Sequence, residues 1–323
     1  MMETLEIKNF KSIKSLKLRC RRVNIFIGEP NTGKSNILEA LGLLSYTVYG
    51  NARLIDFVRL ESMIDLFYDR SLEEEIIIAP SKAKTTPSKF SIKFKDGSFR
   101  GEFNGRHIFS FTYEGGHPGV ILRELSEFKF YRFSPISVFS VQRSDFLLPP
   151  NGANLVAVVL ARKSLRRLIA QIFGKFGFEF VLKPHENRIE LQKKLEEGVV
   201  ISFPYCTVSD TLQRIVFYLT AIRSNKNSVL IFEEPEAHAF PFYTRHLAEL
   251  IALDKNRNQY FISTHNPYFL LSILEKTPKK ELNIFLTYLE NYQTKVRQLK
   301  DKDIERILDE GIDVFWNIEN LTA

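Results

Sequence analysis

The chain has 323 residues, 44% of them hydrophobic and 26% charged, with a net charge of +7; this composition supports one large globular domain or two smaller ones, and the basic balance permits nucleic-acid contact or simply a solvated surface. The two cysteines, Cys20 and Cys206, lie far apart without metal-ligand spacing, which argues against a disulfide framework or a zinc site and favours a reducing, cytoplasmic compartment. The longest apolar runs are too short to span a bilayer, so no membrane span or membrane partner is expected.

The first half of the chain is predicted to hold mainly strands and one helix. Residues 5–19 alternate apolar and polar side chains, as two paired strands do, and 23–27 (VNIFI) has the composition of a buried strand. From Lys34, apolar residues recur on one helical face. The stretch 51–80 shows no clear pattern. Residues 88–140 contain Asp-Gly, Asn-Gly and Gly-Gly pairs, which are hairpin signals between short strands.

The second half is predicted to mix helices and strands. Residues 151–173 are expected to form a single helix, in which Arg162 with Arg166 and Lys163 with Arg167 make a basic face suited to phosphate contact or to solvent. The remaining predicted helices are 209–223, 243–254 and one beginning near 303, and the predicted strands are 178–184, 187–195, 198–204, 228–232, 259–264, 283–290 and 294–300.

The stretch GEPNTGKSN, residues 28–36, fits the pattern G-x-x-x-x-G-K-[ST] between a buried strand and a helix. Its glycines let the backbone turn tightly and direct N–H groups at one anion, and the following helix adds its positive end. The lysine would bridge the β- and γ-phosphates of a nucleotide, and the serine hydroxyl would bind Mg²⁺. The predicted nucleotide-binding residues of this loop are Gly28, Asn31, Thr32, Gly33, Lys34, Ser35 and Asn36.

Polar residues follow two later buried strands. In SVLIFEEPEAH, Glu233 is expected to hold Mg²⁺, through water, and Glu234 to polarise the attacking water; an acidic helix start is the alternative. In QYFISTHNP, His265 just past the strand is expected to sense the γ-phosphate or orient that water, the alternative being a structural or solvated histidine. About 200 residues separate Lys34 from Glu233, so a whole lobe lies between the two motifs.

Together these motifs resemble the SMC/RecF-type branch of ABC ATPases, within the small AAA group related to the ATPase heads of OLD-family nucleases. LEIKNFKSI resembles the family's opening strand and turn, and GEPNTGKS its Walker A loop. VSDTLQR stands where the signature helix begins, LIFEEPEAH resembles Walker B with the D-loop, and STHNP resembles the switch-histidine loop. Their order covers nearly the whole chain.

The resemblance implies an α/β fold: a P-loop NTPase of the ABC ATPase head type, with an antiparallel β-subdomain and a short inserted helical lobe. On this basis the chain is expected to be one head, divided into a nucleotide-binding lobe with the β-subdomain (1–150), an inserted helical and β lobe (151–206), and a lobe carrying the signature, Walker B and switch histidine (207–323).

The resemblance also implies that two heads sandwich two ATP molecules. Ser209 matches the signature serine that faces the partner's γ-phosphate; the alternative, an ordinary helix cap, is compatible with that role. Here SDT replaces the glycine pair of transporter ATPases. Gln142, in SVFSVQRSD, is expected to follow a strand and to stand at the junction where the family carries its Q-loop ligand for Mg²⁺. Lys11 and Ser12 would contact the nucleotide, or would simply end an exposed strand.

These features favour an ATP-hydrolysing switch that uses ATP and Mg²⁺, closes as a homodimer on ATP, and acts on DNA or on a partner effector in repair or mobile-element defence. The alternatives are a transporter's nucleotide-binding subunit, which the SDT signature opposes, and a nucleotide-dependent scaffold of low turnover, which Glu234 opposes. The segments available are too short for SMC coiled coils or for a Toprim nuclease domain, so a nuclease or toxin activity would come from a partner protein.

Overall fold

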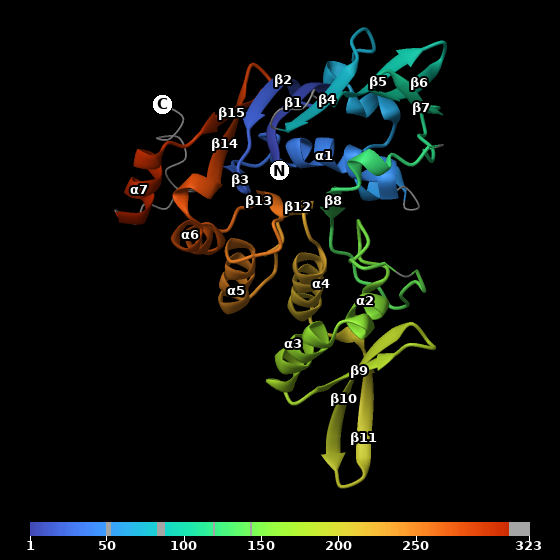
Figure 1. The fold of residues 1–323 in the computed structure, drawn as a ribbon, viewed down its shortest axis with the longest axis vertical. Helices are drawn as coiled ribbons and strands as arrows, with labels where there is room; N and C mark the ends of the chain where they lie inside the picture. Colours follow the sequence, from blue (N-terminus) through green and yellow to red (C-terminus); the bar gives the residue numbers. More distant parts are fainter. Residues whose placement is uncertain (50–52, 83–87, 119, 143, 310–323) are drawn as a thin grey trace.

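The computed structural model describes residues 1–49, 53–82, 88–118, 120–142 and 144–309. Its elements form two stacked sheets with one helix between them, a row of helices beneath, and an arm that projects away from this body (Figure 1). None of the helices in the described part of the chain has the length and apolar character needed to cross a membrane.

The central sheet is parallel except at one edge, where β15 runs antiparallel to β14. Its strand β3 is buried at every position because both faces are covered. Ile25 and Ile27 pack toward the helices beneath the sheet, whereas Phe26 packs toward the opposite face. The sheet order is β15-β14-β3-β13-β12-β8, with bounds Gln293–Gln298, Leu282–Glu290, Val23–Gly28, Gln259–Ser263, Val229–Glu233 and Phe128–Tyr131.

The second sheet is antiparallel and lies over the other face of the central sheet (Figure 1). Asp96-Gly97 and Asn104-Gly105 have positive φ at both positions, as the predicted two-residue hairpin turns require. The sheet order is β2-β1-β4-β5-β6-β7, with bounds Ile13–Arg19, Met2–Phe10, Ile76–Lys82, Phe90–Lys95, Ser98–Phe103 and Arg106–Phe111.

Helix α1 (Lys34–Tyr49) is the layer between the two sheets, and the loop 29–33 joins it to the end of β3. Three helices, α4 (Asp210–Ser224), α5 (Pro241–Ala252) and α6 (Pro267–Lys276), cover the opposite face of the central sheet, and α7 (Asp301–Asp309) packs beside α6. Helix α6 was not predicted from the sequence; it begins with Pro267 and is capped by Asn266, which accepts a hydrogen bond from the Phe269 N–H at 3.1 Å.

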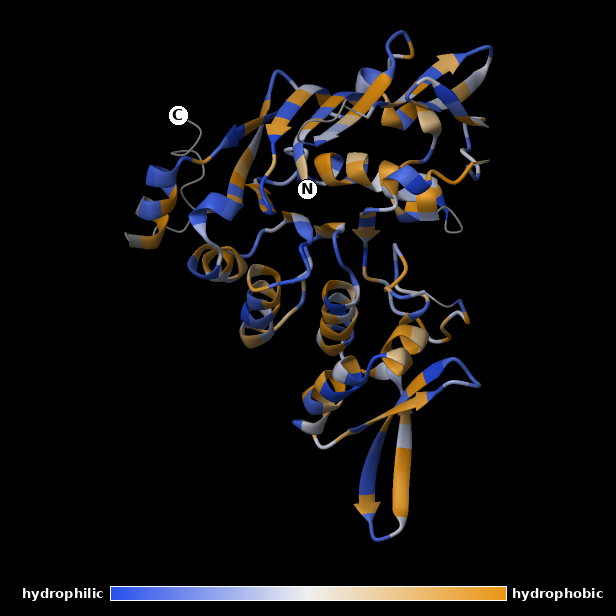
Figure 2. Cartoon of the chain, viewed as in Figure 1, coloured by the Kyte–Doolittle hydropathy of each residue, from blue (hydrophilic) through white to orange (hydrophobic). Residues whose placement is uncertain are grey.

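The arm consists of α2 (Leu155–Ala161), α3 (Lys163–Gly174) and the sheet of β9 (Glu179–Lys183), β10 (Arg188–Glu196) and β11 (Val199–Pro204). It extends from the body beyond α4 (Figure 1). Strand β11 forms one edge of its sheet, is exposed throughout, and is apolar where the neighbouring β10 is hydrophilic (Figure 2).

The prediction of one helix over 151–173 is wrong, because the backbone at Arg162 is extended and separates α2 from α3. The Arg162 guanidinium donates to the Asp145 carbonyl and, at 3.4 Å, to the Ser224 carbonyl, so tertiary contacts hold the break. Arg162 therefore lies outside the helix that contains Arg166, and the predicted pairing of these two residues on one helical face does not form.

The stretch 51–80, which the sequence left without a prediction, contains short 3₁₀ helices followed by β4. Buried side chains such as Phe57 and Met63 attach this stretch to the core around α1. The 3₁₀ helices of the described chain are Leu54–Asp56, Met63–Leu66, Tyr68–Arg70, Arg123–Leu125, Tyr205–Thr207 and Lys279–Glu281.

Candidate nucleotide-binding site

The predicted residues of the phosphate loop, the glutamate pair and His265 gather at one edge of the central sheet. The phosphate loop follows β3, the glutamate pair stands at the end of β12, and His265 follows β13. Strands β3, β13 and β12 are adjacent and parallel, so their carboxyl ends meet. Ligands of open parallel sheets bind at this edge.

The two glycines of the phosphate loop are required by conformation and by space. Gly28 and Gly33 have φ of +147° and +96°, which side chains rarely adopt. A Cβ on Gly28 would lie 2.3 Å from the Thr287 carbonyl oxygen, and one on Gly33 would lie 1.9 Å from Thr294 Oγ1. The loop therefore packs directly against the hairpin of β14 and β15.

A threonine network braces the loop from that hairpin. Thr32 Oγ1 donates to the Glu29 carbonyl at 2.8 Å and lies 2.8 Å from Thr287 Oγ1. Thr294 Oγ1 donates to the Thr32 carbonyl at 3.1 Å. Thr287 and Thr294 lie more than 250 residues from the loop in sequence, so no local pattern identified them.

Asn36 and Ser12 join the same network. Asn36 Nδ2 donates to Ser12 Oγ at 2.6 Å, and Ser12 Oγ lies 2.6 Å from Thr294 Oγ1. The turn between β1 and β2 is thereby fastened to the start of α1. Both residues were predicted to contact nucleotide, and the structure places them beside the loop.

Lys34 is buried in the loop, and its Nζ donates to the Gly28 and Glu29 carbonyls at 2.8 and 2.6 Å. Burial lowers its pKa to about 8, although Glu234 and Glu29 act in the opposite direction. The first turn of α1 has no acidic side chain, so its N–H groups and the lysine make an electropositive anion site.

Ser35 and Glu233 supply a suitable donor set for Mg²⁺. The Ser35 hydroxyl hydrogen-bonds the Glu233 carboxylate; burial alone would raise the pKa of that carboxyl, but this bond together with Arg132 and Arg59 holds it below its ordinary value. A hydroxyl and a carboxylate beside phosphate oxygens is how proteins usually bind Mg²⁺. Among the described residues, no cluster of three or more acidic, histidine or cysteine side chains would hold a metal by itself.

Glu234 and His265 face each other across the ends of β12 and β13. His265 Nε2 lies 3.4 Å from Glu234 Oε1, and both side chains are partly exposed. Glu234 has a φ of +41°, and its N–H donates to the Ser263 carbonyl at 3.1 Å, which turns its side chain out of the strand. Burial and the nearby Lys34 lower the pKa of His265, so its imidazole is neutral at neutral pH.

The family described as "AAA domain, putative AbiEii toxin, Type IV TA system" matches residues 23–272, which include the phosphate loop, both glutamates and His265. The chain belongs to this AAA family. Two curated relatives of the AAA protein are the Uncharacterized protein MJECL10 of Methanocaldococcus jannaschii, 38% identical over 24% of this chain, and an "ATP/GTP phosphatase" of Helicobacter pylori, 22% identical over 94%. The match covers 41% of the first relative and 93% of the second.

Solved structures of SMC heads share the fold of the AAA protein. An SMC head bound to the C-terminal winged-helix domain of ScpA has a TM-score of 0.58 at 16% identity, covering 95% of this chain and 99% of that one. A Pyrococcus furiosus SMC head with an extended coiled coil, bound to the C-terminal domain of ScpA, has a TM-score of 0.59 at 15% identity, with coverage of 96% and 98%. The predicted fold, an α/β P-loop head of the SMC and ABC type, is confirmed.

Arg132 and Glu39 are residues of the AAA site that the sequence interpretation missed. Tyr131 of β8 pairs with Phe232 of β12, so Arg132 emerges beside Glu233, with Nη2 3.0 Å from Oε2. Glu39, on the first turns of α1, is completely buried. Lys11, which was predicted to contact the nucleotide, donates from Nζ to Glu39 Oε2 at 2.5 Å. Its ammonium group is therefore paired with that carboxylate.

Glu236 is a further missed residue, two positions beyond Glu234. It is buried, and one carboxylate oxygen accepts a hydrogen bond from the hydroxyl of Thr264, the neighbour of His265. Its other oxygen, Oε2, has no partner. Burial raises the pKa of Glu236 to about 7. This carboxyl joins the loop after β12 to the loop after β13.

Ser209 and Gln142 lie away from this group in the AAA protein. Ser209 is exposed at the start of α4, where it is the N-cap residue but makes no side-chain cap hydrogen bond. It lines a groove of about 830 Å³ whose walls are mainly apolar, with several aromatic side chains, between the arm and the start of α5. Gln142 is exposed, and the strand expected just before it is absent, because β8 ends at Tyr131 and 132–142 are irregular.

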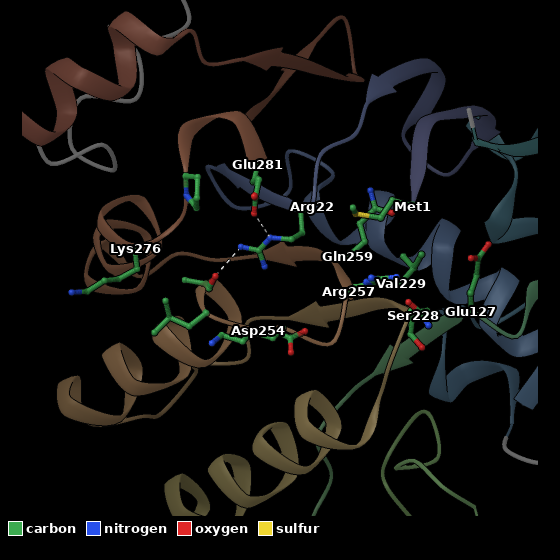
Figure 3. Close-up of a pocket in the computed structure, with 15 residues that line it drawn as sticks. Met1, Arg22, Glu127, Ser228, Val229, Asp254, Arg257, Gln259, Lys276 and Glu281 are labelled. Atoms are coloured by element: carbon green, nitrogen blue, oxygen red, sulfur yellow. Dashed lines mark hydrogen bonds and ion pairs between the residues drawn. The ribbon is translucent and has the colours of Figure 1, made fainter. Parts of the chain in front are cut away.

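A cavity of about 740 Å³, lined by many charged and polar residues, lies at the opposite edge of the central sheet (Figure 3). Arg22, Ser228 and Gln259 line it from the starts of β3, β12 and β13. Figure 3 shows Arg22 turned toward Glu281, which it contacts at 2.6 Å. Because the predicted phosphate-binding residues follow the other ends of these strands, this cavity is separate from the candidate nucleotide site.

Proposed function

We propose that this AAA protein binds ATP with Mg²⁺ and hydrolyses it to ADP and phosphate. The observation that carries the proposal is the convergence, at one sheet edge, of the buried Lys34, the Ser35–Glu233 pair and the Glu234–His265 pair. Each supplies a part that phosphoryl transfer needs: phosphate contact, metal ligands, and a base beside a water-orienting group. The Helicobacter pylori relative, described as an ATP/GTP phosphatase, supports the same reaction class.

Lys34 would exchange the carbonyls of Gly28 and Glu29 for the β- and γ-phosphates, which are stronger charge-assisted partners. Mg²⁺, held by Ser35 and Glu233, would neutralise charge on the phosphates. Glu234 would take a proton from the attacking water while the bond from the γ-phosphorus to the leaving ADP oxygen breaks. Neutral His265, 3.4 Å from Glu234, would orient that water.

We further propose that two copies close on ATP and act together. Ser209 stands at the exposed start of α4, on a groove whose lining contains no residue of the phosphate loop. A phosphate meeting this helix start would therefore come from a second copy, and Gln142 would join the metal ligands only after its segment moves. The net charge of +7 and the toxin–antitoxin family description support action on DNA or on a partner effector, in repair or mobile-element defence.

The activity is tested by two variants with separate expected effects. Lys34→Ala should lose ATP binding in calorimetry, because each charge-assisted contact contributes roughly 1.5–3 kcal/mol. Glu234→Gln should keep ATP binding and lose most turnover, since it removes the base but spares the metal ligands. Wild-type turnover in Glu234→Gln would refute the assignment of the base.

The dimer is tested by sedimentation of Glu234→Gln with ATP and Mg²⁺, where a shift from monomer to dimer is expected. ADP lacks the γ-phosphate and should not support the shift, because a ligand moves an equilibrium only by its differential affinity. A protein that binds ATP but stays monomeric, or that dimerises equally with ADP, would instead be a low-turnover scaffold.

A further inference from the structure

Two carboxylates share two guanidinium groups next to the phosphate loop. Arg132 Nη2 lies 3.0 Å from Glu233 Oε2 and 3.5 Å from Glu39 Oε1. Arg59 contacts the same pair in the reverse order of closeness, with Nε 2.7 Å from Glu39 Oε1 and Nη2 3.6 Å from Glu233 Oε1. Each arginine therefore reaches both carboxylates without movement of the backbone.

The two carboxylates differ in what else they bind. Glu233 also accepts from the Ser35 hydroxyl, which is the pair assigned to Mg²⁺. Glu39 is fully buried on α1, and its other oxygen is held by Lys11 at 2.5 Å. Lys11 in turn donates to the Arg59 carbonyl at 2.6 Å. Glu39 thus keeps its charge partners whether or not a metal is bound, whereas Glu233 is a carboxylate at which Mg²⁺ would compete with the arginines.

A divalent cation at Glu233 and an arginine 3.0 Å from the same carboxylate repel each other. The carboxylate cannot neutralise both, and the site is only partly exposed, so solvent screens this repulsion incompletely. An arginine that leaves Glu233 is stabilised by another anion nearby, because Arg132 is only partly exposed and solvent compensates a lost partner incompletely. Glu39 Oε1, 3.5 Å from Arg132, is that anion.

We propose that Arg132 is a positioning residue that competes with Mg²⁺ for Glu233 and transfers to Glu39 when the metal arrives with the nucleotide. Arg59 also gives up its contact with Glu233, but this change is smaller because Arg59 already lies closer to Glu39. This exchange makes Glu39 a determinant of metal affinity although it lies outside the metal's own ligands. The proposal rests on the assignment of Ser35 and Glu233 to Mg²⁺ in the proposed function.

The exchange predicts opposite effects for the two partners. Removing the Arg132 charge frees Glu233 and should strengthen the contribution of Mg²⁺ to nucleotide binding. Removing the Glu39 charge leaves both arginines with Glu233 as their remaining carboxylate and should weaken that contribution. A purely structural role would give losses in both variants, because each would disturb the same packed site.

The experiment measures ADP binding by calorimetry, once with Mg²⁺ and once with a chelator. The quantity compared between variants is the affinity with Mg²⁺ divided by the affinity with the chelator. ADP is used because it is not hydrolysed and is not expected to close the dimer, so neither process contributes to the measured affinity. Arg132→Gln should raise the ratio roughly threefold to fivefold, and Glu39→Gln should lower it by a similar factor, the range expected for one partly exposed ion pair. The double variant should fall between the two single variants, because Arg59 still has Glu233 as its remaining carboxylate once the charge of Glu39 is removed.

Arg245→Gln is the matched control, since Arg245 forms an exposed pair with Glu249 on α5, away from the site, and should leave the ratio unchanged. Arg132→Lys should return the ratio toward the wild-type value, because it restores the competing charge. If Glu39→Gln fails to fold in thermal unfolding, Arg132→Gln and Arg132→Lys decide the question on their own.

An unchanged or lowered ratio in Arg132→Gln, or the same direction of change in Arg132→Gln and Glu39→Gln, would overturn the exchange. Absence of nucleotide binding in the wild-type protein, with or without metal, would instead overturn the proposed function. The two failures are therefore distinguishable in one data set.

Discussion

Replacement of Glu236 by glutamine tests whether a buried carboxyl makes folding depend on pH. Glu236 is 4% exposed, one oxygen accepts from Thr264, and Oε2 has no partner. Burial therefore penalises its anion and raises its pKa from 4.5 to about 7. Glutamine has nearly the same shape and keeps an oxygen for Thr264, but it does not titrate.

The sign follows from linkage. A carboxyl whose pKa is raised by folding contributes stability fully below its unfolded pKa and loses it as pH rises through the folded pKa. With 4.5 unfolded and about 7 folded, the loss falls between these values. Over the accessible window from about pH 5 to about pH 8.5 it amounts to about 2.5 kcal/mol of unfolding free energy, at 1.36 kcal/mol per pKa unit.

Urea denaturation of the wild-type protein and Glu236→Gln, without nucleotide, measures the effect at each pH. Any constant penalty of burying the amide cancels when the difference between the two proteins is followed with pH. The wild-type protein should lose about 2.5 kcal/mol relative to Glu236→Gln between about pH 5 and about pH 8.5. A difference that stays flat within 0.5 kcal/mol, roughly the error of such comparisons, would refute the buried, unpartnered carboxyl.

Three further outcomes are expected. Gly33→Ala should destabilise the protein by more than about 1 kcal/mol in urea denaturation and weaken ATP binding, because its Cβ would meet Thr294 and its φ is +96°; unchanged stability would contradict the packed loop. ATP affinity should fall as pH rises above about 8, because phosphate contact needs protonated Lys34, whereas Lys34→Arg should flatten this dependence in calorimetry; a flat wild-type profile would contradict the lowered pKa. Ser209→Arg in the Glu234→Gln background should block ATP-driven dimerisation in sedimentation while monomeric ATP binding persists; normal dimers would exclude Ser209 from the interface.

The phosphate loop and the loops after β12 and β13 could be predicted from the sequence because their signals are local. Each is a short buried strand followed directly by polar residues, and parallel strands bring such ends to one edge. The run Gly33, Lys34, Ser35 can be recognised as a phosphate loop from the strand that precedes it and the helix that follows it. The same local logic placed the hairpin turns at Asp96 and Asn104 and the join between β10 and β11.

The errors arose where a long-range contact overrides a local pattern. The helical periodicity of 151–173 is continuous, but the Arg162 side chain is held by carbonyls of Asp145 and Ser224, and the helix breaks there. The strand expected just before Gln142 does not form either, because the sheet pairing of β8 ends at Tyr131.

By itself, then, the sequence determined the family of the protein, the phosphate loop and the glutamate and histidine beyond it, because each depends on neighbours within a few residues. Only the tertiary structure brought Arg132 and Glu39 to Glu233, and Thr294 to Gly33. These contacts join residues from about 100 to more than 250 positions apart, and their energy comes from charge pairing and close packing across separate strands and helices. No periodicity or motif in one stretch of chain records which distant side chain will complete such a pair.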